Sequence, residues 1–139
     1  MAEDRIAQLR AIPMFAALPD DALARLAASA TDFDARAGQV LIQPNQPGSG
    51  VLLLTAGHAT VELGGQTIDC TVGDCIGELS LLVDDAVHVA RVRAASDITG
   101  FAINRHDFEA LLESDARIAT ALLRVLAHRL VATDRMLAR

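Results

Sequence analysis

The sequence contains no lysine, and all 12 of its basic residues are arginine. Without lysine the chain cannot form a phosphate-binding loop of the Walker type or a Schiff base with a carbonyl substrate. Acidic residues outnumber basic ones and give a formal net charge of −6. A nucleic-acid surface needs clustered cations that displace counterions from phosphates, so we expect no direct contact with DNA or RNA.

Long apolar runs and cysteine-rich patterns are also lacking. The apolar run at residues 51–54 has the length of a strand, whereas a bilayer span needs roughly 18 apolar residues. The first residues are acidic and lack the apolar centre of a signal peptide, so we expect a cytoplasmic protein without membrane contact. Cys70 and Cys75 are too few for a structural zinc site, and we expect two reduced thiols and no bound metal.

The spacing of apolar residues divides the chain into three parts. Helical spacing predicts two short helices within residues 1–30, the second of which opens at Pro19. Between residues 31 and 103 apolar side chains alternate, and turn residues separate many short strands, which is typical of a sandwich or barrel. Helical spacing returns over residues 104–139, where Asn104 is expected to cap a short helix and Ser114 a longer one. This order predicts a single domain over residues 1–139, mainly β with flanking helices (α+β).

The last predicted helix, which runs to about Leu137, carries two apolar stripes. The first can cover the body of the domain and consists of Ile118, Leu122 and Val125. The second follows the three- and four-residue spacing of a coiled-coil seam, which favours a homodimer through a parallel helix pair. It consists of Leu123, Leu126, Leu130, Thr133 and Leu137. The alternative is one wide stripe packed wholly on its own domain.

A cassette over residues 73–94 carries a resemblance to a known family. Its first half reads GDCIGELSLL over residues 73–82, and its second half reads VHVARVRA over residues 87–94. Both halves, and the length of the loop between them, resemble the phosphate-binding cassette of the cyclic nucleotide-binding domain family, in its catabolite activator protein branch. Residues 38–42 and 54–61 resemble two further segments of that family, so that residues 9–137 can be aligned with it.

The resemblance implies a double-stranded β-helix, or jelly-roll barrel, with N-terminal helices and a long C-terminal helix. It also implies a regulatory domain that senses a cyclic nucleotide or another small anion. In the family, the helix that starts inside the cassette holds the ligand, and its glutamate binds the ribose hydroxyl. Backbone N–H groups at a helix start attract anions, which fits this role. The matching positions here are Gly77, Glu78, Leu79 and Ser80.

The second half of the cassette departs from the family at the phosphate anchor. His88 stands where the family has arginine, and Val89 follows where serine or alanine is common. Neutral imidazole brings no charge, whereas arginine stays ionised and binds phosphate through two donors. Because Arg91 and Arg93 are expected on the opposite strand face, we expect binding of cAMP or cGMP to be weak or lost. Thr133 matches a position of the family's long helix that touches the base.

Two other functions stay open on the same fold. The domain could have lost its ligand and act through protein contacts or dimerisation, or Cys75 with His58 or His88 could hold a heme. We expect no enzyme activity and no cofactor beyond a cyclic nucleotide ligand, because the chain shows no nucleophile elbow, paired acids or metal cluster. The sequence stops at Arg139, before the helix-turn-helix of the family's transcription regulators, so direct operator binding is not expected.

Overall fold

The computed structural model describes all residues except 1, 44–49, 64, 71–74, 77–90 and 138–139. The chain begins with helices α1 (Ala2–Arg10) and α2 (Asp20–Ser29), joined through the short 3-10 helix η1 (Pro13–Phe15). It ends with α4 (Arg105–Ser114) and the long α5 (Ala116–Leu137). The strands between them are β1 (Thr31–Ala35), β2 (Val40–Ile42), β3 (Gly50–Ala56), β4 (Ala59–Leu63), β5 (Gln66–Cys70), β6 (Cys75–Ile76), β7 (Arg91–Ala94) and β8 (Ile98–Asn104).

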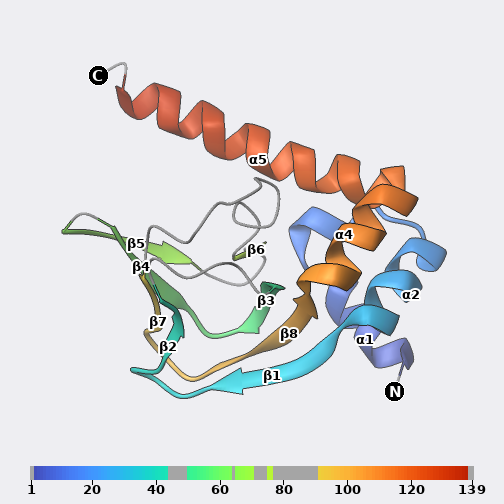
Figure 1. Cartoon of the computed structure of the whole chain (residues 1–139), viewed down its shortest axis with the longest axis horizontal. Coiled ribbons are helices and arrows are strands. Elements are labelled where there is room, and N and C mark those ends of the chain that lie inside the picture. Colours follow the sequence, from blue (N-terminus) through green and yellow to red (C-terminus); the bar gives the residue numbers. More distant parts are fainter. Residues whose placement is uncertain (1, 44–49, 64, 71–74, 77–90, 138–139) are drawn as a thin grey trace.

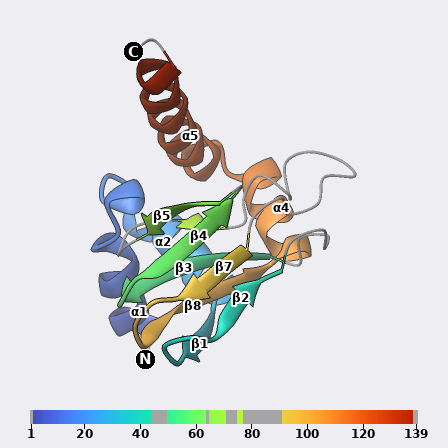
Figure 2. The same ribbon diagram turned by 90° about the vertical axis from the view of Figure 1, so that its left-hand side faces the viewer.

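The described strands form two four-stranded sheets (Figures 1 and 2). One has the order β1-β8-β3-β6 and the other the order β2-β7-β4-β5, and the paired strands in both are antiparallel. Apart from the β4–β5 hairpin, successive strands pass from one sheet to the other, as in a jelly roll. The predicted mainly β class with flanking helices is therefore confirmed, and the described strands form two facing sheets rather than one closed ring.

Two apolar cores result from the alternation of side chains along the strands. On β3, Val51 and Leu53 face the helices, whereas Leu54 faces the second sheet. The first core joins the helices to the first sheet, and the second core lies between the sheets. Among the helices that the structure describes, none is long and apolar enough to cross a bilayer.

Gly100 on β8 allows a close approach between strands. A Cβ atom at this position would overlap the carbonyl oxygen of Leu53 and would lie 3.1 Å from the ring of Phe33. We expect Gly100→Ala to lower the free energy of unfolding by about 1–3 kcal/mol, because backbone on one side cannot move away. Urea denaturation followed by circular dichroism measures this loss. Gly38→Ala adds a methyl group in open space, but the φ of +91° at this position strains alanine as well, so a loss there reports backbone conformation rather than overlap. A Gly100→Ala chain as stable as the wild type would show that the close approach is not limiting.

The two C-terminal helices begin at different kinds of cap. Asn104 caps α4 as predicted, because its side chain accepts the N–H of Asp107 at 2.8 Å. The prediction for α5 is wrong: Ser114 ends α4, and its hydroxyl donates to the carbonyl of Ala110 at 2.7 Å. Asp115 instead accepts the N–H of Arg117 at 3.0 Å. A carboxylate also complements the positive end of the helix dipole, which favours Asp115 over serine at this position.

Candidate functional site

The predicted cassette connects the two sheets. One of its described ends is β6, at the edge of the first sheet, and the other is β7, between β2 and β4 in the second sheet. The predicted ligand contacts Gly77, Glu78, Leu79, Ser80, His88 and Val89 lie outside the described residues. Thr133 lies on α5, but its side chain is outside the described part as well. The structure thus locates the ends of the cassette, and the roles of these seven residues stay predictions.

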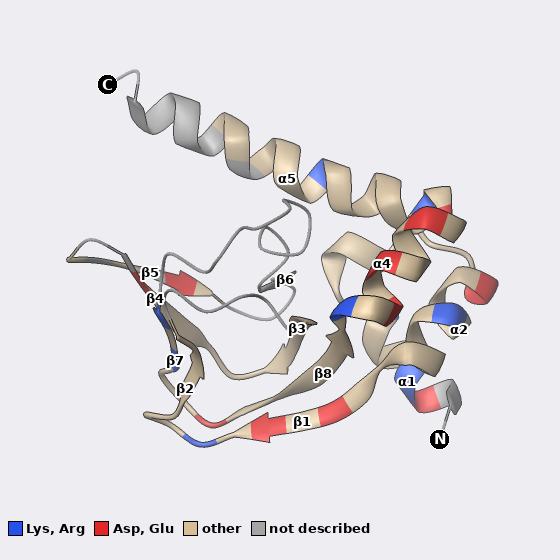
Figure 3. Ribbon diagram, viewed as in Figure 1, with Lys and Arg blue, Asp and Glu red and all other residues tan. Residues whose placement is uncertain are grey.

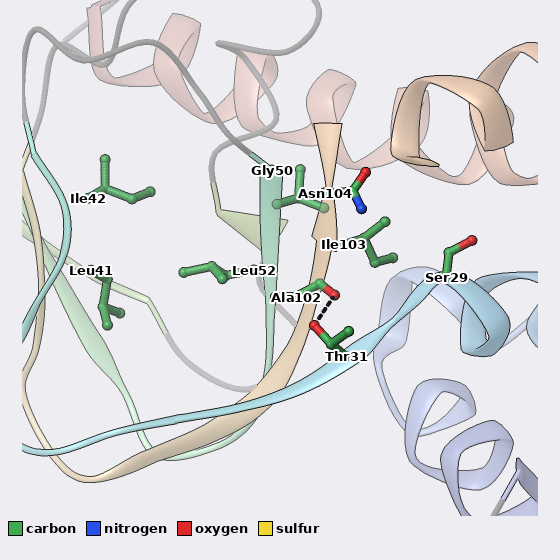
Figure 4. A pocket seen from close by; sticks show the side chains of 10 residues that line it. Ser29, Thr31, Leu41, Ile42, Gly50, Leu52, Ala102, Ile103 and Asn104 are labelled. Carbon is green, nitrogen blue, oxygen red and sulfur yellow. Dashed lines mark hydrogen bonds between the residues drawn. The ribbon is translucent and has the colours of Figure 1, made fainter. Parts of the chain in front are cut away.

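A pocket of about 290 Å³ lies beside the start of the cassette (Figure 4). Leu41 and Ile42 of β2 line one side, and Leu52 of β3 points toward them from the other. Leu52 is also the register partner of Ile76, the residue directly before the undescribed part of the cassette. The volume is at the lower end of the range for pockets that bind small molecules.

The described lining of this pocket is mostly apolar and carries no charge. Its polar side chains are those of Ser29, Thr31 and Asn104, and none of the described lining residues carries a charge. The hydroxyl of Thr31 donates to the carbonyl of Ala102 at 3.2 Å, so it is already engaged. These walls suit a sugar or a base better than an anion, because a buried charge needs a charged or hydrogen-bonded partner.

The arginines of β7 face away from the space between the sheets. Val92 and Ala94 are buried in the core between the sheets, whereas Arg91 and Arg93 alternate with them and are half-exposed. Both arginines pair with Glu62 of β4, with N–O distances of 4.0 Å for Arg91 and 3.2 Å for Arg93. The sequence predicts this face for both residues, and the structure confirms it. Neither arginine is therefore placed to replace the missing anchor of the cassette.

An ion cluster anchors the base of α5 to α2. Asp115 is only 4% exposed and accepts hydrogen bonds from the Nε and Nη2 atoms of Arg117 at 2.9 and 2.8 Å. Arg25 of α2 reaches the same carboxylate at 3.2 Å. Arg117 also binds both carboxylate oxygens of Asp21 at 3.0 and 2.9 Å. Side chains from α2, the α4–α5 junction and α5 thus share one network.

The cluster keeps its acids ionised. Hydrogen bonds from the Arg117 side chain hold the pKa of Asp115 well below its usual range, and they outweigh burial, which acts in the opposite direction. Hydrogen bonds from Arg117 also lower the pKa of Asp21, and the two acids together raise the pKa of Arg117 above its ordinary value. The sequence does not reveal this cluster, because its members lie about ninety residues apart.

The residues considered for a heme are not brought together in the described part of the chain. His58 is exposed at the turn between β3 and β4. Cys75 lies on β6, but its side chain and the whole of His88 are outside the described residues. Among the described residues, no cluster of three or more histidine, cysteine or acidic side chains could hold a metal ion.

Comparison with known proteins decides the family. The model of the cyclic nucleotide-binding domain matches residues 33–115, which is more than half of the chain. The chain belongs to this family. The match begins in β1 and ends at the base of α5, so it includes both sheets and the whole cassette. The resemblance seen in the sequence is thereby confirmed.

Relatives in this family include larger proteins. The chain is 31% identical over 137 residues to the acetyltransferase Pat of Mycolicibacterium smegmatis, which covers 95% of the chain and 40% of Pat. A mutant of the cAMP-binding acyltransferase from Mycobacterium smegmatis is 32% identical, with a TM-score of 0.76 over 94% of the chain and 42% of that protein. The guanosine-bound regulatory subunit of a cAMP-independent protein kinase A from Trypanosoma cruzi is 25% identical, with a TM-score of 0.74 over 85% of the chain and 43% of that subunit. The chain spans less than half the length of each.

Proposed function

We propose that the chain is one ligand-sensing regulatory unit whose affinity for cAMP and cGMP is weakened at the phosphate anchor, and that it is not itself an enzyme. The observation that carries this proposal is that the described part of the pocket offers no cation for the phosphate. No described residue that lines the pocket is charged, and both described arginines of β7 are paired with Glu62 outside it. A cyclic phosphate is an anion and needs a charge-assisted hydrogen bond. The anchor position holds His88, and histidine is largely neutral above pH 7.

The remaining ligand contacts in this proposal follow the family. By the family resemblance, backbone N–H groups near Gly77, Leu79 and Ser80 would face the ligand, and Glu78 would accept a hydrogen bond from the ribose. These contacts do not require a charge on the ligand. Since the Trypanosoma cruzi relative is described as cAMP-independent and is bound to guanosine, an uncharged nucleoside is the ligand class that best fits a neutral pocket.

Calorimetric titration of the wild-type chain with cAMP, cGMP and guanosine at about pH 7.5 tests this function, because histidine is mostly neutral there. We expect guanosine to bind at least as tightly as either cyclic nucleotide, since it offers ribose and base without an unpaired anion. Tight binding of cAMP with no heat from guanosine would show that the phosphate still has an anchor.

A second candidate function is dimerisation through α5, and a specific observation favours it. Leu123, Leu130 and Val131 are 64%, 62% and 47% exposed and lie on one face of the helix. Ile118 and Leu122 pack into the core as the sequence predicts. The prediction for Leu126 is wrong, because this seam residue packs against the same core. Burial of a leucine or valine side chain contributes about 1.5–3 kcal/mol, so a second copy could cover this face with a clear gain. We propose a parallel pair of α5 helices on this seam.

Leu130→Glu is expected to make the chain sediment as a monomer at concentrations where the wild type sediments as a dimer. The added carboxylates would face each other across the seam, and the apolar contact would be lost. Sedimentation velocity at micromolar concentration measures the difference. Ala110→Glu adds the same charge at an exposed position of α4 and should leave the dimer intact. A wild-type chain that is monomeric under these conditions would contradict this function.

A further inference from the structure

A second hollow of the molecule is separate from the space between the sheets. It is a groove of about 740 Å³ between the N-terminal helices and α5. One wall is formed by Pro13 and Met14 of η1 and by Pro19 before α2. The other wall is the side of α5 that carries Arg124 and His128. The contacts between η1 and α5 fix the position of the two walls relative to each other.

The floor and rim of the groove are apolar and partly open to solvent. Pro13 and Pro19 are exposed, while Met14 and Val125 are half-buried. Proline fixes its own φ, so both ends of the first wall have a restricted backbone before any partner arrives. A preformed groove loses little conformational entropy on binding, which favours a peptide that inserts apolar side chains.

The charged side chains of the described lining are all cationic. They are Arg117, whose guanidinium is already shared by Asp21 and Asp115, and Arg124. Arg124 is exposed and forms no hydrogen bond or ion pair with any residue that the structure describes. It is the one charged residue between positions 118 and 128, and most of the described part of α5 has the tan colour of residues other than Lys, Arg, Asp and Glu (Figure 3). A cation beside an apolar groove with no partner among the described side chains is unusual in a chain of net charge −6.

We propose that this groove binds an acidic amphipathic peptide segment of a partner protein. Apolar side chains of the peptide enter between η1 and α5, and its carboxylates pair with Arg124. Charge complementarity selects this occupant over a second copy of the chain. From residue 116 to 137, α5 carries four arginines and one aspartate, so that a second α5 laid in the groove would bring like charges together. The exposed leucines of the proposed dimer seam are on a neighbouring face of α5, which leaves the groove accessible.

Fluorescence anisotropy with two labelled peptides tests the proposal. The first contains repeated Glu-Leu-Leu units, and the second has Lys in place of every Glu. We expect the acidic peptide to bind the wild-type chain and the basic peptide not to bind. Arg124→Glu should weaken binding of the acidic peptide by about tenfold or more, because a charge-assisted pair is replaced by repulsion. Ala17→Glu, which places a carboxylate in the groove lining, should weaken it independently.

Arg36→Glu is the matched control. Arg36 is exposed in the turn between β1 and β2, so this variant makes the same change in net charge away from the groove and should bind the acidic peptide as the wild type does. Circular dichroism confirms that each variant is folded. Failure of the acidic peptide to bind, or equal losses for Arg124→Glu and Arg36→Glu, would overturn the proposal. If the wild-type chain is a dimer and Arg124→Glu dissociates it, the groove binds a second copy of the chain, and the peptide proposal is overturned as well.

Discussion

His88→Arg is expected to raise the affinity of the chain for cAMP by about 10- to 150-fold. This range corresponds to roughly 1.5–3 kcal/mol for a charge-assisted hydrogen bond. Arginine stays ionised at every relevant pH and can bind the cyclic phosphate through two parallel N–H donors. Isothermal calorimetry at about pH 7.5, where histidine is mostly neutral, measures the gain.

The alternation of β7 supports this expectation. Val92 and Ala94 are buried between the sheets, and Arg91 and Arg93 are held outside by Glu62. If the strand continues toward its start with the same alternation, position 88 shares the inner face with Val92. An arginine there would reach the ligand rather than solvent. Replacing the neighbouring Val89 with alanine as well restores the smaller side chain that the family favours and should add to the gain.

The control for this experiment is His58→Arg. His58 is exposed at the turn between β3 and β4, so the variant gains the same charge outside the predicted cassette. We expect its affinity for cAMP to equal that of the wild type. If both variants gain equally, the effect comes from net charge, and the assignment of position 88 as the anchor is wrong. If neither gains, the rest of the pocket has also lost its fit to a cyclic nucleotide.

Asp115→Ala is expected to lower the free energy of unfolding by about 2–3 kcal/mol. The substitution removes the shared carboxylate of Arg25 and Arg117 and leaves two guanidinium groups facing each other without it. The loss stays below that of a fully buried ion pair, because both arginines are partly in water. It also removes the cap of α5. Urea denaturation at neutral pH measures the change.

Asp32→Ala provides a matched comparison. Asp32 pairs with Arg5 at 3.3 Å, but its side chain is mostly exposed. Exposed ion pairs contribute little, so we expect a change below about 1 kcal/mol. Equal losses for the two variants would contradict a special role of the cluster at the base of α5.

Acid should weaken the same cluster. The pKa of Asp115 in the folded chain is well below its ordinary value, which lies near 4 for a free aspartate. The stability that it contributes is therefore complete above about pH 5 and is lost as the pH falls toward the folded-state pKa. We expect Asp115→Asn to flatten the loss of stability between about pH 5 and pH 2, as followed by urea denaturation at each pH. An unchanged pH profile would contradict this.

Much of the fold could be predicted from local patterns. The alternation of Ala59 and Val61 with polar neighbours, and the turn residues around them, locate β4 and β5 correctly. Asn104 is identified as a cap because a short polar side chain directly precedes a helical pattern. The error at Ser114 has a similar origin. Serine and aspartate are adjacent and both suit a cap, and only the hydrogen bond from the backbone N–H of Arg117 to Asp115 shows which residue takes that position.

Some features of the candidate site could likewise be predicted from the sequence, and others could not. The cassette pattern predicts the family, which the family match confirms, because spacing and residue type are both written in the chain. The outer position of Arg91 and Arg93 follows from the period of a strand. The pocket wall made by Ile42 and Leu52 could not be predicted, since it depends on how β2 and β3 of different sheets approach each other. The position of Arg124 beside Pro13 and Pro19 likewise depends on the packing of the two ends of the chain.

Calorimetric titration of the wild-type chain with cAMP, at about pH 7.5 and again at about pH 5.5, tests most directly whether the phosphate anchor is weakened. We expect a dissociation constant well above micromolar at the higher pH, because the described pocket offers no cation. At the lower pH we expect tighter binding, because a protonated histidine at position 88 can pair with the phosphate. Micromolar binding at about pH 7.5 that does not change with pH would contradict the assignment.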